Sequence, residues 1–119
     1  MNPSETTNND CIFCRIAAGT IPAEVVYEDA GSLAFQDTHP KAPVHILIIP
    51  RKHIASINAV QAEDEALLGH LFSVARRVAQ DQRLTERGYR LMINTGDEGG
   101  QTVYHLHLHL LGGKHLGRY

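Results

Sequence analysis

Short apolar runs separated by turn residues mark the first half of the chain. Residues 24–28 and 32–37 each have the β-branched and aromatic content of a strand, and residues 29–31 between them have turn composition. We therefore expect an antiparallel hairpin here. A more uniformly apolar run over residues 44–49 predicts a buried strand, which Pro50 ends.

A three- and four-residue repeat of apolar positions predicts one long helix in the middle of the chain. The repeat consists of Leu67, Leu68, Leu71, Val74, Ala75, Val78 and Ala79. Acidic residues 63–65 fall in its predicted first turn, where negative charge suits the helix dipole. A shorter helix is predicted over residues 11–18, with Asp10 as its N-cap and Gly19 as its end.

Two more strands are predicted in the last third of the chain. Residues 89–94 and 103–111 alternate between polar and apolar, and a glycine-rich segment over 96–100 separates them. The predicted order is helix, hairpin, strand, helix and two strands. This order favours an α+β fold around an antiparallel sheet. The long helix between the third and fourth strands leaves the pairing of those two strands open.

Three histidines alternate with leucines near the end of the chain. On a strand, His105, His107 and His109 would share one face with a spacing of ~6.7 Å. The intervening leucines would face the core from the other side, so the histidines would point to the opposite surface. The alternative interpretations are a solvated strand face and a helical metal site. The helical site would pair His105 with His109, but the glutamate of a zinc protease motif is missing after the first histidine.

Such a row of imidazoles suits three kinds of chemistry. It can bind a metal, transfer protons or supply a nitrogen nucleophile. The segment 94–102 just upstream contains glycines that let backbone N–H groups converge on an anion. A hairpin loop is the ordinary interpretation of these glycines, but a phosphate cradle fits better beside histidines. It is not a P-loop, because no Gly-Lys-Ser/Thr follows.

Charge and composition exclude several classes of function. The 119 residues include eleven Lys+Arg, thirteen Asp+Glu and eight His, which gives a net charge of −2 with His neutral. This balance offers no chain-wide attraction to nucleic acid or to anionic membranes. The longest apolar run, residues 46–49, is far shorter than the ~20 residues of a membrane span. We therefore expect neither nucleic acid nor a membrane as a partner.

The start of the chain and its cysteines indicate the compartment. Residues 1–10 are polar and lack the basic start and apolar stretch of a signal peptide, so we expect a disordered lead-in to a cytoplasmic protein. One domain is expected over residues 11–119. Cys11 and Cys14 are the only cysteines, in a C-x-x-C pair. In a cytoplasmic protein this pair indicates metal or redox chemistry, although two thiols packed in a core remain an alternative.

These motifs together resemble a known family. The sequence of residues 105–111 has the His-φ-His-φ-His-φ-φ form of the histidine triad (HIT) superfamily, and the wider pattern is similar to its Hint branch, the histidine triad nucleotide-binding proteins. The matching stretches are 21–23, 33–37, 42–54, 67–71, 88–90 and 99–105. The resemblance covers nearly all of the chain from Cys11 to Gly113.

The resemblance implies a fold and an activity. The fold is a five-stranded antiparallel sheet with two helices, and the sheet continues across a homodimer. The activity is hydrolysis of the P–N bond of purine nucleoside 5′-phosphoramidates, and also of aminoacyl and acyl adenylates, through a nucleotidyl-histidine intermediate that releases the nucleoside monophosphate. Two alternatives remain: a diadenosine-polyphosphate hydrolase or nucleotidyl transferase, and a nucleotide-binding adaptor with incidental turnover.

The resemblance also assigns residues. It places the nucleophile at His107, and the other catalytic histidines at His45, His105 and His109. The nucleotide-binding positions are Asp37, Thr38, Asn94, Gly100, Gln101, Thr102, His107 and His109. Ile12, Ile16 and Phe35 are candidates for walls around the base. No organic cofactor is implied.

Zinc-binding relatives add a metal site to these expectations. Their zinc ligands match Cys11, Cys14, His53 and His105, so the resemblance implies a structural Zn²⁺ held by two thiolates and two imidazoles. Such an ion would join the first helix to the start of the histidine segment. Among the remaining histidines, we expect His70 in the core or at an interface.

Overall fold

The computed structural model describes residues 10–118, so the lead-in expected over residues 1–10 lies outside it except for Asp10. The helices are α1 (Ile12–Ala17) and α2 (Glu65–Asp81), and the strands are β1 (Val25–Glu28), β2 (Ser32–Gln36), β3 (Val44–Pro50), β4 (Tyr89–Met92) and β5 (Leu108–Gly112). Short 3₁₀ turns cover Ile57–Ala59 and Ala62–Asp64. The expected α+β architecture is confirmed.

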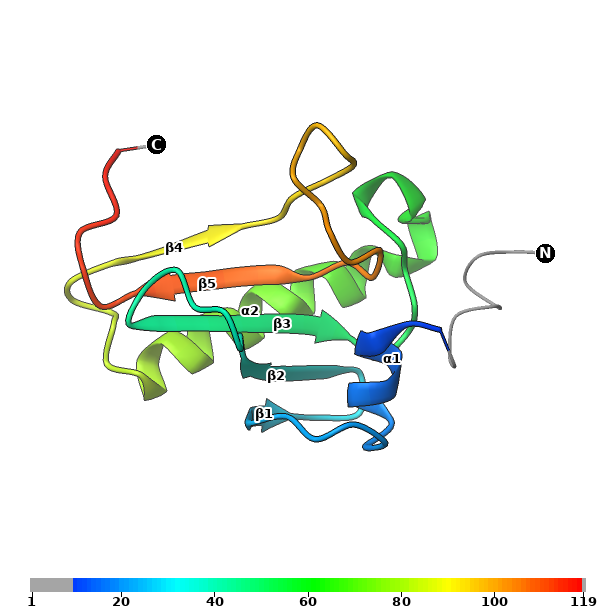
Figure 1. The fold of residues 1–119 in the computed structure, drawn as a ribbon, viewed down its shortest axis with the longest axis horizontal. Coiled ribbons are helices and arrows are strands. Elements are labelled where there is room, and N and C mark those ends of the chain that lie inside the picture. The colour runs from blue at the N-terminus through cyan, green and yellow to red at the C-terminus, as the bar shows by residue number, and fades with distance from the viewer. Residues whose placement is uncertain (1–9, 119) are drawn as a thin grey trace.

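The five strands form one sheet in the order β1-β2-β3-β5-β4, and every neighbouring pair is antiparallel. The pairing that the sequence left open is now defined. Strands β3 and β4 do not pair, because β5 lies between them and matches Leu108 to Ile48 and His109 to Met92. This order places β5, which carries His109, between the central strand β3 and the edge strand β4 (Figure 1).

The two faces of the sheet are covered by different helices. Helix α2 crosses one face, and α1 lies against the other near the end of β3 (Figure 1). The α2 side buries the main core, which includes Leu106, Leu108 and Leu110. The α1 side buries a smaller cluster that includes Phe13 and Phe35. Burial of these apolar side chains is the main force that holds both layers together.

Both helices begin later than the sequence predicts. Helix α1 is capped by Cys11, whose Sγ accepts a hydrogen bond from the backbone N–H of Cys14 at 3.3 Å, and not by Asp10. Helix α2 begins at Glu65, since Ala62–Asp64 forms a separate 3₁₀ turn. The carboxylate of Asp64 is buried there and accepts a hydrogen bond from the backbone N–H of Gln61.

The last strand is shorter than predicted. It begins at Leu108 and not at residue 103, because the main chain just before it bonds outside the sheet. The N–H of Leu106 donates to the carbonyl oxygen of Ile54 at 2.7 Å, and the carbonyl oxygen of His105 accepts from the ring of His107. Only His109 of the three histidines therefore lies on a strand. The alternation of sides nevertheless persists, because Leu106 is buried in the same core as the leucines of β5.

Candidate active site and neighbouring metal-binding cluster

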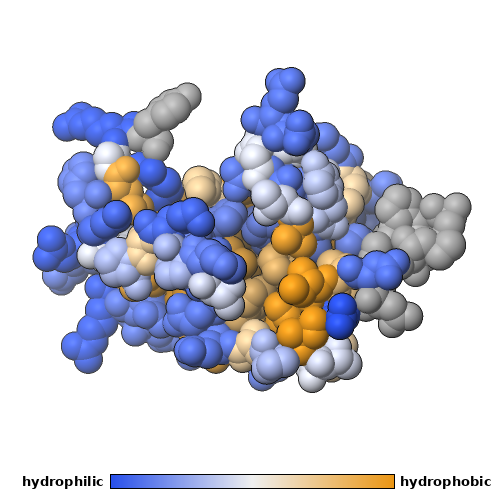
Figure 2. All heavy atoms as spheres, in the orientation of Figure 1, coloured by the Kyte–Doolittle hydropathy of each residue, from blue (hydrophilic) through white to orange (hydrophobic). Residues whose placement is uncertain are grey.

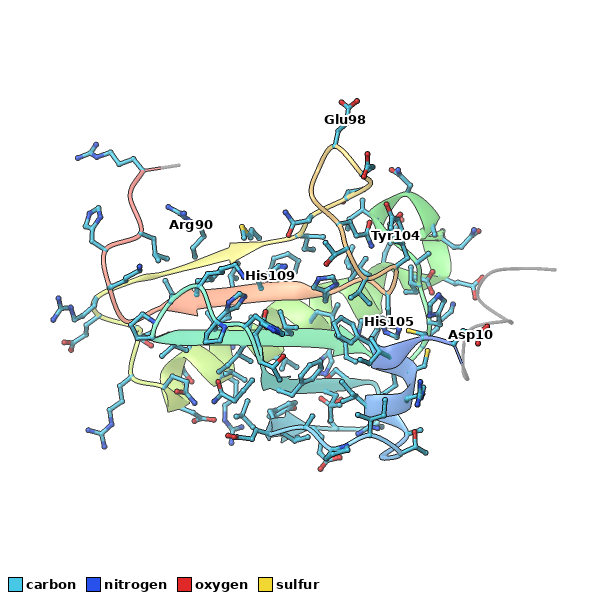
Figure 3. All side chains as sticks on the ribbon, viewed as in Figure 1. Asp10, Arg90, Glu98, Tyr104, His105 and His109 are labelled. Carbon is cyan, nitrogen blue, oxygen red and sulfur yellow. The ribbon has the colours of Figure 1, made fainter. Side chains whose placement is uncertain are left out.

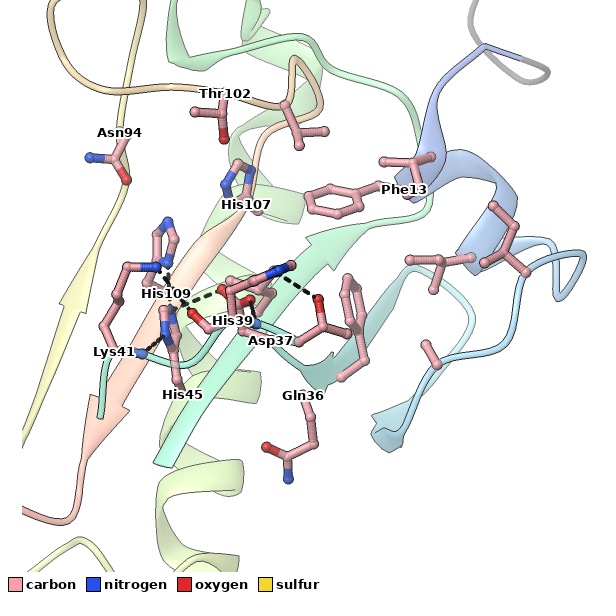
Figure 4. A pocket seen from close by; sticks show the side chains of 18 of the residues that line it. Phe13, Gln36, Asp37, His39, Lys41, His45, Asn94, Thr102, His107 and His109 are labelled. Atoms are coloured by element: carbon pink, nitrogen blue, oxygen red, sulfur yellow. Dashed lines mark hydrogen bonds and ion pairs between the residues drawn. The ribbon is translucent and has the colours of Figure 1, made fainter. Parts of the chain in front are cut away.

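A cavity of about 650 Å³ lies on the α1 side of the sheet. Most of the predicted nucleotide-binding and catalytic residues line it, namely Asp37, Thr38, His45, Asn94, Gly100, Thr102, His107 and His109. They come from β3, β5 and the loops beside them (Figure 4). The predicted residues that do not line the cavity are Gln101 and His105.

The cavity has an apolar part and a polar part. The predicted base walls Ile12, Ile16 and Phe35 line the apolar part. Ile12 is also one of the exposed large hydrophobic residues, and Figure 2 shows hydrophobic side chains gathered over the region of α1. Phe13 stands between the two parts, with its ring edge-on to that of His107 at a centroid distance of 5.1 Å. A planar apolar group therefore fits one end, and a polar group that can form hydrogen bonds fits the other.

His107 has a defined tautomer. Its Nδ1 lies 2.8 Å from the carbonyl oxygen of His105. Because a carbonyl oxygen only accepts, Nδ1 carries the proton and Nε2 keeps its lone pair. The side chain is buried, and this burial lowers the pKa of His107 below its usual value. The imidazole is thus neutral at physiological pH, which is the form that can act as a nucleophile.

His109 lies beside His107, with a ring-centroid distance of 4.9 Å. Its Nδ1 is 2.9 Å from Nε2 of His45, and the same His45 nitrogen lies 3.4 Å from a carboxylate oxygen of Asp37. Burial lowers the pKa of His109 to about 4 and also lowers the pKa of His45. Two neutral imidazoles therefore occupy the polar end of the cavity together with one carboxylate.

Side-chain hydrogen bonds from Asn94 and Gln101 hold the glycine-rich loop in place. The side-chain Nδ2 of Asn94 donates to the carbonyl oxygen of Gly99 at 2.8 Å. Gln101 is buried and uses its side chain as a cross-link: Oε1 accepts from the N–H of Gly96, and Nε2 donates to the carbonyl oxygen of Ala55. The side chain of Gln101 thus fixes the loop that carries the lining residues Gly100 and Thr102.

The remaining predicted residues form a second cluster. The ligand atoms of Cys11, Cys14, His53 and His105 all lie within 4.8 Å of one another. Nδ1 of His105 is 3.3 Å from Sγ of Cys11 and 3.2 Å from Nδ1 of His53, while Sγ of Cys14 is 3.4 Å from Nδ1 of His53. His105 lies under the start of α1, whereas His109 lies further along β5 (Figure 3).

This cluster fits a metal ion. Around a tetrahedral zinc ion, nitrogen and sulfur ligands lie about 3.3–3.8 Å apart, which is close to the separations here. The proton of His105 is on Nε2, because that atom donates to the carbonyl oxygen of Pro50 at 2.8 Å. Its Nδ1 lone pair therefore faces the cluster, and the backbone contact orients the ring as in many metal sites. The four residues could bind a metal.

Several expectations about the histidines need correction. They do not form one exposed row, because His105 is fully buried and His107 is only 6% exposed. This burial contradicts the solvated-face alternative, and the helical alternative is wrong because His109 lies on β5 and His105 is outside any helix. His70 is not in the core: its side chain is 45% exposed, and its Nε2 lies 2.7 Å from a carboxylate oxygen of Asp29.

Sequence reasoning missed some lining residues. Phe13, His39 and Lys41 line the cavity, although no motif singled them out. A signal that could have been used existed for Phe13, because it lies in a short predicted helix beside the candidate walls Ile12 and Ile16. Neither helix in the described part of the chain has the length and apolar character needed to cross a bilayer.

Comparisons with known proteins agree with this geometry. The family model described as the HIT domain matches residues 18–116. The chain is 48% identical over 108 residues to the purine nucleoside phosphoramidase of Escherichia coli K12, and the match covers 91% of both chains.

Solved structures show the same fold. The crystal structure of a HIT family hydrolase from Legionella pneumophila matches with a TM-score of 0.89 and 54% identity, over 91% of this chain and 96% of that one. A Zn-bound histidine triad family protein from Mycobacterium smegmatis matches with a TM-score of 0.78 and 33% identity, over 90% of this chain and 77% of that one. The chain therefore belongs to the HIT family.

Proposed function

We propose that this protein is a nucleotide-binding hydrolase that cleaves the P–N bond of purine nucleoside 5′-phosphoramidates, and the P–O bond to the acyl group in aminoacyl and acyl adenylates. The observation that carries the proposal is the 2.8 Å hydrogen bond from Nδ1 of His107 to the carbonyl oxygen of His105. It leaves Nε2 as an unprotonated nitrogen on a residue that lines the cavity. The name of the Escherichia coli relative supports the substrate class.

The reaction has two displacement steps. In the first, Nε2 of His107 attacks the phosphorus and the P–N bond breaks, with its electron pair on the departing amine, which takes up a proton. In the second, water attacks the phosphorus of the nucleotidyl-histidine, releasing the imidazole and the nucleoside monophosphate. Imidazole suits both steps, because the neutral ring is a good nucleophile and also a good leaving group.

The cavity offers groups for each part of the substrate. The apolar end would hold the purine, and Asp37 would accept hydrogen bonds from the ribose hydroxyls. Asn94, Gly100 and Thr102 line the cavity on the side where the phosphate would meet His107 and His109. A volume of about 650 Å³ lies within the usual range of small-molecule sites.

The test compares turnover of an adenosine 5′-phosphoramidate with that of a diadenosine polyphosphate. We expect the wild-type chain to prefer the phosphoramidate. His107→Ala should lose turnover by several orders of magnitude and still bind adenosine monophosphate. His115→Ala is the matched control, because it removes an exposed imidazole outside the cavity. Unchanged hydrolysis by His107→Ala would reject the nucleophile, and a preference for the polyphosphate would reject the substrate class.

We also propose that the metal-binding cluster holds a structural Zn²⁺. When bound, the ion would supply four coordination bonds that join α1 to the segment before β5. The separations within the cluster support this proposal, as does the Zn-bound relative from Mycobacterium smegmatis. Thiolate ligands require reduced cysteines, which supports the expected cytoplasmic location.

A homodimer in which the sheet continues from one copy to the next completes the proposal. Strand β4 lies at an edge of the sheet, so its outer backbone groups are available for another strand. Met92 on this strand is 39% exposed and also lines the cavity. Sedimentation equilibrium should give twice the mass of the chain, and a monomer mass at micromolar concentration would reject the dimer.

A further inference from the structure

His45 has a tautomer that the main chain dictates. Its Nδ1 accepts a hydrogen bond from the backbone N–H of Lys41 at 3.0 Å. A backbone amide nitrogen only donates, so Nδ1 must present a lone pair and the ring proton must be on Nε2. A doubly protonated His45 would turn a second N–H against the amide. The contact therefore specifies a neutral ring with its proton on the far side.

The position of the proton on His45 in turn determines the tautomer of His109. Nε2 of His45 is 2.9 Å from Nδ1 of His109 and 3.4 Å from Oδ2 of Asp37. Because the Nε2–H of His45 has no in-plane lone pair to offer, Nδ1 of His109 must accept. The single proton of a neutral His109 is then on its own Nε2. The backbone amide of Lys41 thus determines the tautomers of two hydrogen-bonded imidazoles, those of His45 and His109.

The Nε2–H of His109, the last group in this series, has no hydrogen-bond partner among the residues that the structure describes. Among the side chains of residues 10–118, Nε2 of His109 is the buried nitrogen or oxygen that lacks a hydrogen bond. It points to the side of the cavity where His107 and Asn94 lie (Figure 4). Buried polar groups are normally satisfied, so an unpaired donor beside the candidate nucleophile indicates a ligand acceptor.

We propose that the main-chain N–H of Lys41, acting through His45, sets His109 as a neutral hydrogen-bond donor to a phosphoryl oxygen of the substrate. This inference rests on the proposed function and deepens it. A phosphoryl oxygen can only accept, so the opposite tautomer of His109 would turn a lone pair toward it. The amide of Lys41 and the ring of His45 are positioning groups, and Nε2 of His109 is the group that contacts the substrate.

The segment around Lys41 is suited to this task. Pro40 and Pro43 restrict the backbone on either side, which limits the freedom of the amide between them. The ammonium group of Lys41 donates to the carbonyl oxygen of His39 at 3.1 Å and takes no part in the amide contact. The main-chain and side-chain roles of this residue can therefore be separated by mutation.

The test measures ring-nitrogen tautomers by long-range ¹H–¹⁵N correlation in the full metal-loaded chain without nucleotide. Lys41→Pro removes the N–H, whereas Lys41→Ala keeps it and removes only the ammonium group. We expect Nε2-protonated His45 and His109 in the wild type and in Lys41→Ala. Lys41→Pro should give mixed tautomers at both rings and roughly tenfold weaker binding of adenosine monophosphate, the loss expected for one hydrogen bond to an anion.

Other outcomes would overturn the inference. Nδ1-protonated His45 or His109 in the wild type would contradict it, as would unchanged tautomers in Lys41→Pro. If Lys41→Pro does not fold, His45→Gln and His45→Leu replace it, since the amide of glutamine can place an N–H near the position of Nε2 and leucine cannot. The Nε2–H form of His109 should persist with glutamine and be lost with leucine, and equal tautomers in both would reject the proposal. Absence of wild-type turnover would reject the function alone, because the tautomers are measured without substrate.

Discussion

The carbonyl oxygen of His105 accepts a hydrogen bond from Nδ1 of His107 at 2.8 Å. The ring of the same His105 presents Nδ1 to the cysteine sulfurs and to His53. One residue therefore belongs to the metal-binding cluster through its side chain and orients the candidate nucleophile through its backbone. The metal-binding cluster and the cavity are therefore two neighbouring sites that both depend on the position of His105.

Metal content is the direct check on the cluster. Protein purified without chelator and then denatured should release about one equivalent of zinc, because four N and S ligands complete a structural site. His53→Ala should release far less and melt several degrees lower, since metal binding contributes to folding free energy. His70→Ala removes an exposed imidazole outside the cluster and should keep the full zinc content. Well under one equivalent from the wild type would reject zinc.

The glycine-rich loop should tolerate no side chain at Gly99. A Cβ there would overlap the carbonyl oxygen of Thr95, so the loop must shift and break the 2.8 Å bond from Asn94. We expect Gly99→Ala to weaken binding of adenosine monophosphate roughly threefold to tenfold, measured by titration calorimetry. Gly69→Ala has open space on α2 and should stabilise the fold by about 0.5–1 kcal/mol. Equal affinity in Gly99→Ala and the wild type would show that the loop does not shape the site.

Burial of neutral His109 should make stability depend on pH. Its folded pKa of about 4 lies below the unfolded value of about 6.5, so the unfolded chain binds more protons between these values. The contribution is fully present above about pH 6.5 and is lost as the pH falls toward about 4. Urea unfolding at several pH values should therefore show a steeper acid loss for the wild type than for His109→Gln. Parallel curves for the two proteins would contradict this assignment.

Much of the fold follows from the apolar pattern. The hairpin of β1 and β2, the buried strand β3 and the long helix α2 agree with the predictions to within a few residues. Helix α2 buries one apolar face, whereas β2 and β3 bury apolar residues on both sides of the sheet. The start of β5 was predicted wrongly, since alternation continues through residues whose backbone bonds elsewhere. Side-chain periodicity reports which side a residue faces, and it does not report which partner its N–H and C=O groups choose.

The residue types of the candidate site were predictable from the sequence, but the assignment of each histidine to the cavity or to the metal-binding cluster needed the structure. In the sequence, the alternating histidines and the C-x-x-C pair indicated nucleophile and metal chemistry. The resemblance placed His105 among both the catalytic residues and the zinc ligands, and the structure places its side chain in the metal-binding cluster and outside the lining of the cavity. The tautomers depend on single backbone groups, such as the amide of Lys41, that leave no trace in the amino-acid pattern.

The strict alternation from Leu106 to Leu110 makes this stretch intolerant of length changes. The pairing of Ile48 with Leu108 holds β5 in place, so a one-residue insertion just before it would exchange the two sides of the preceding segment. An imidazole would then enter the hydrophobic core between the sheet and α2, and a leucine would face the cavity. Deletion and insertion scanning of residues 103–107 should consequently be far more damaging than substitution at any exposed position there.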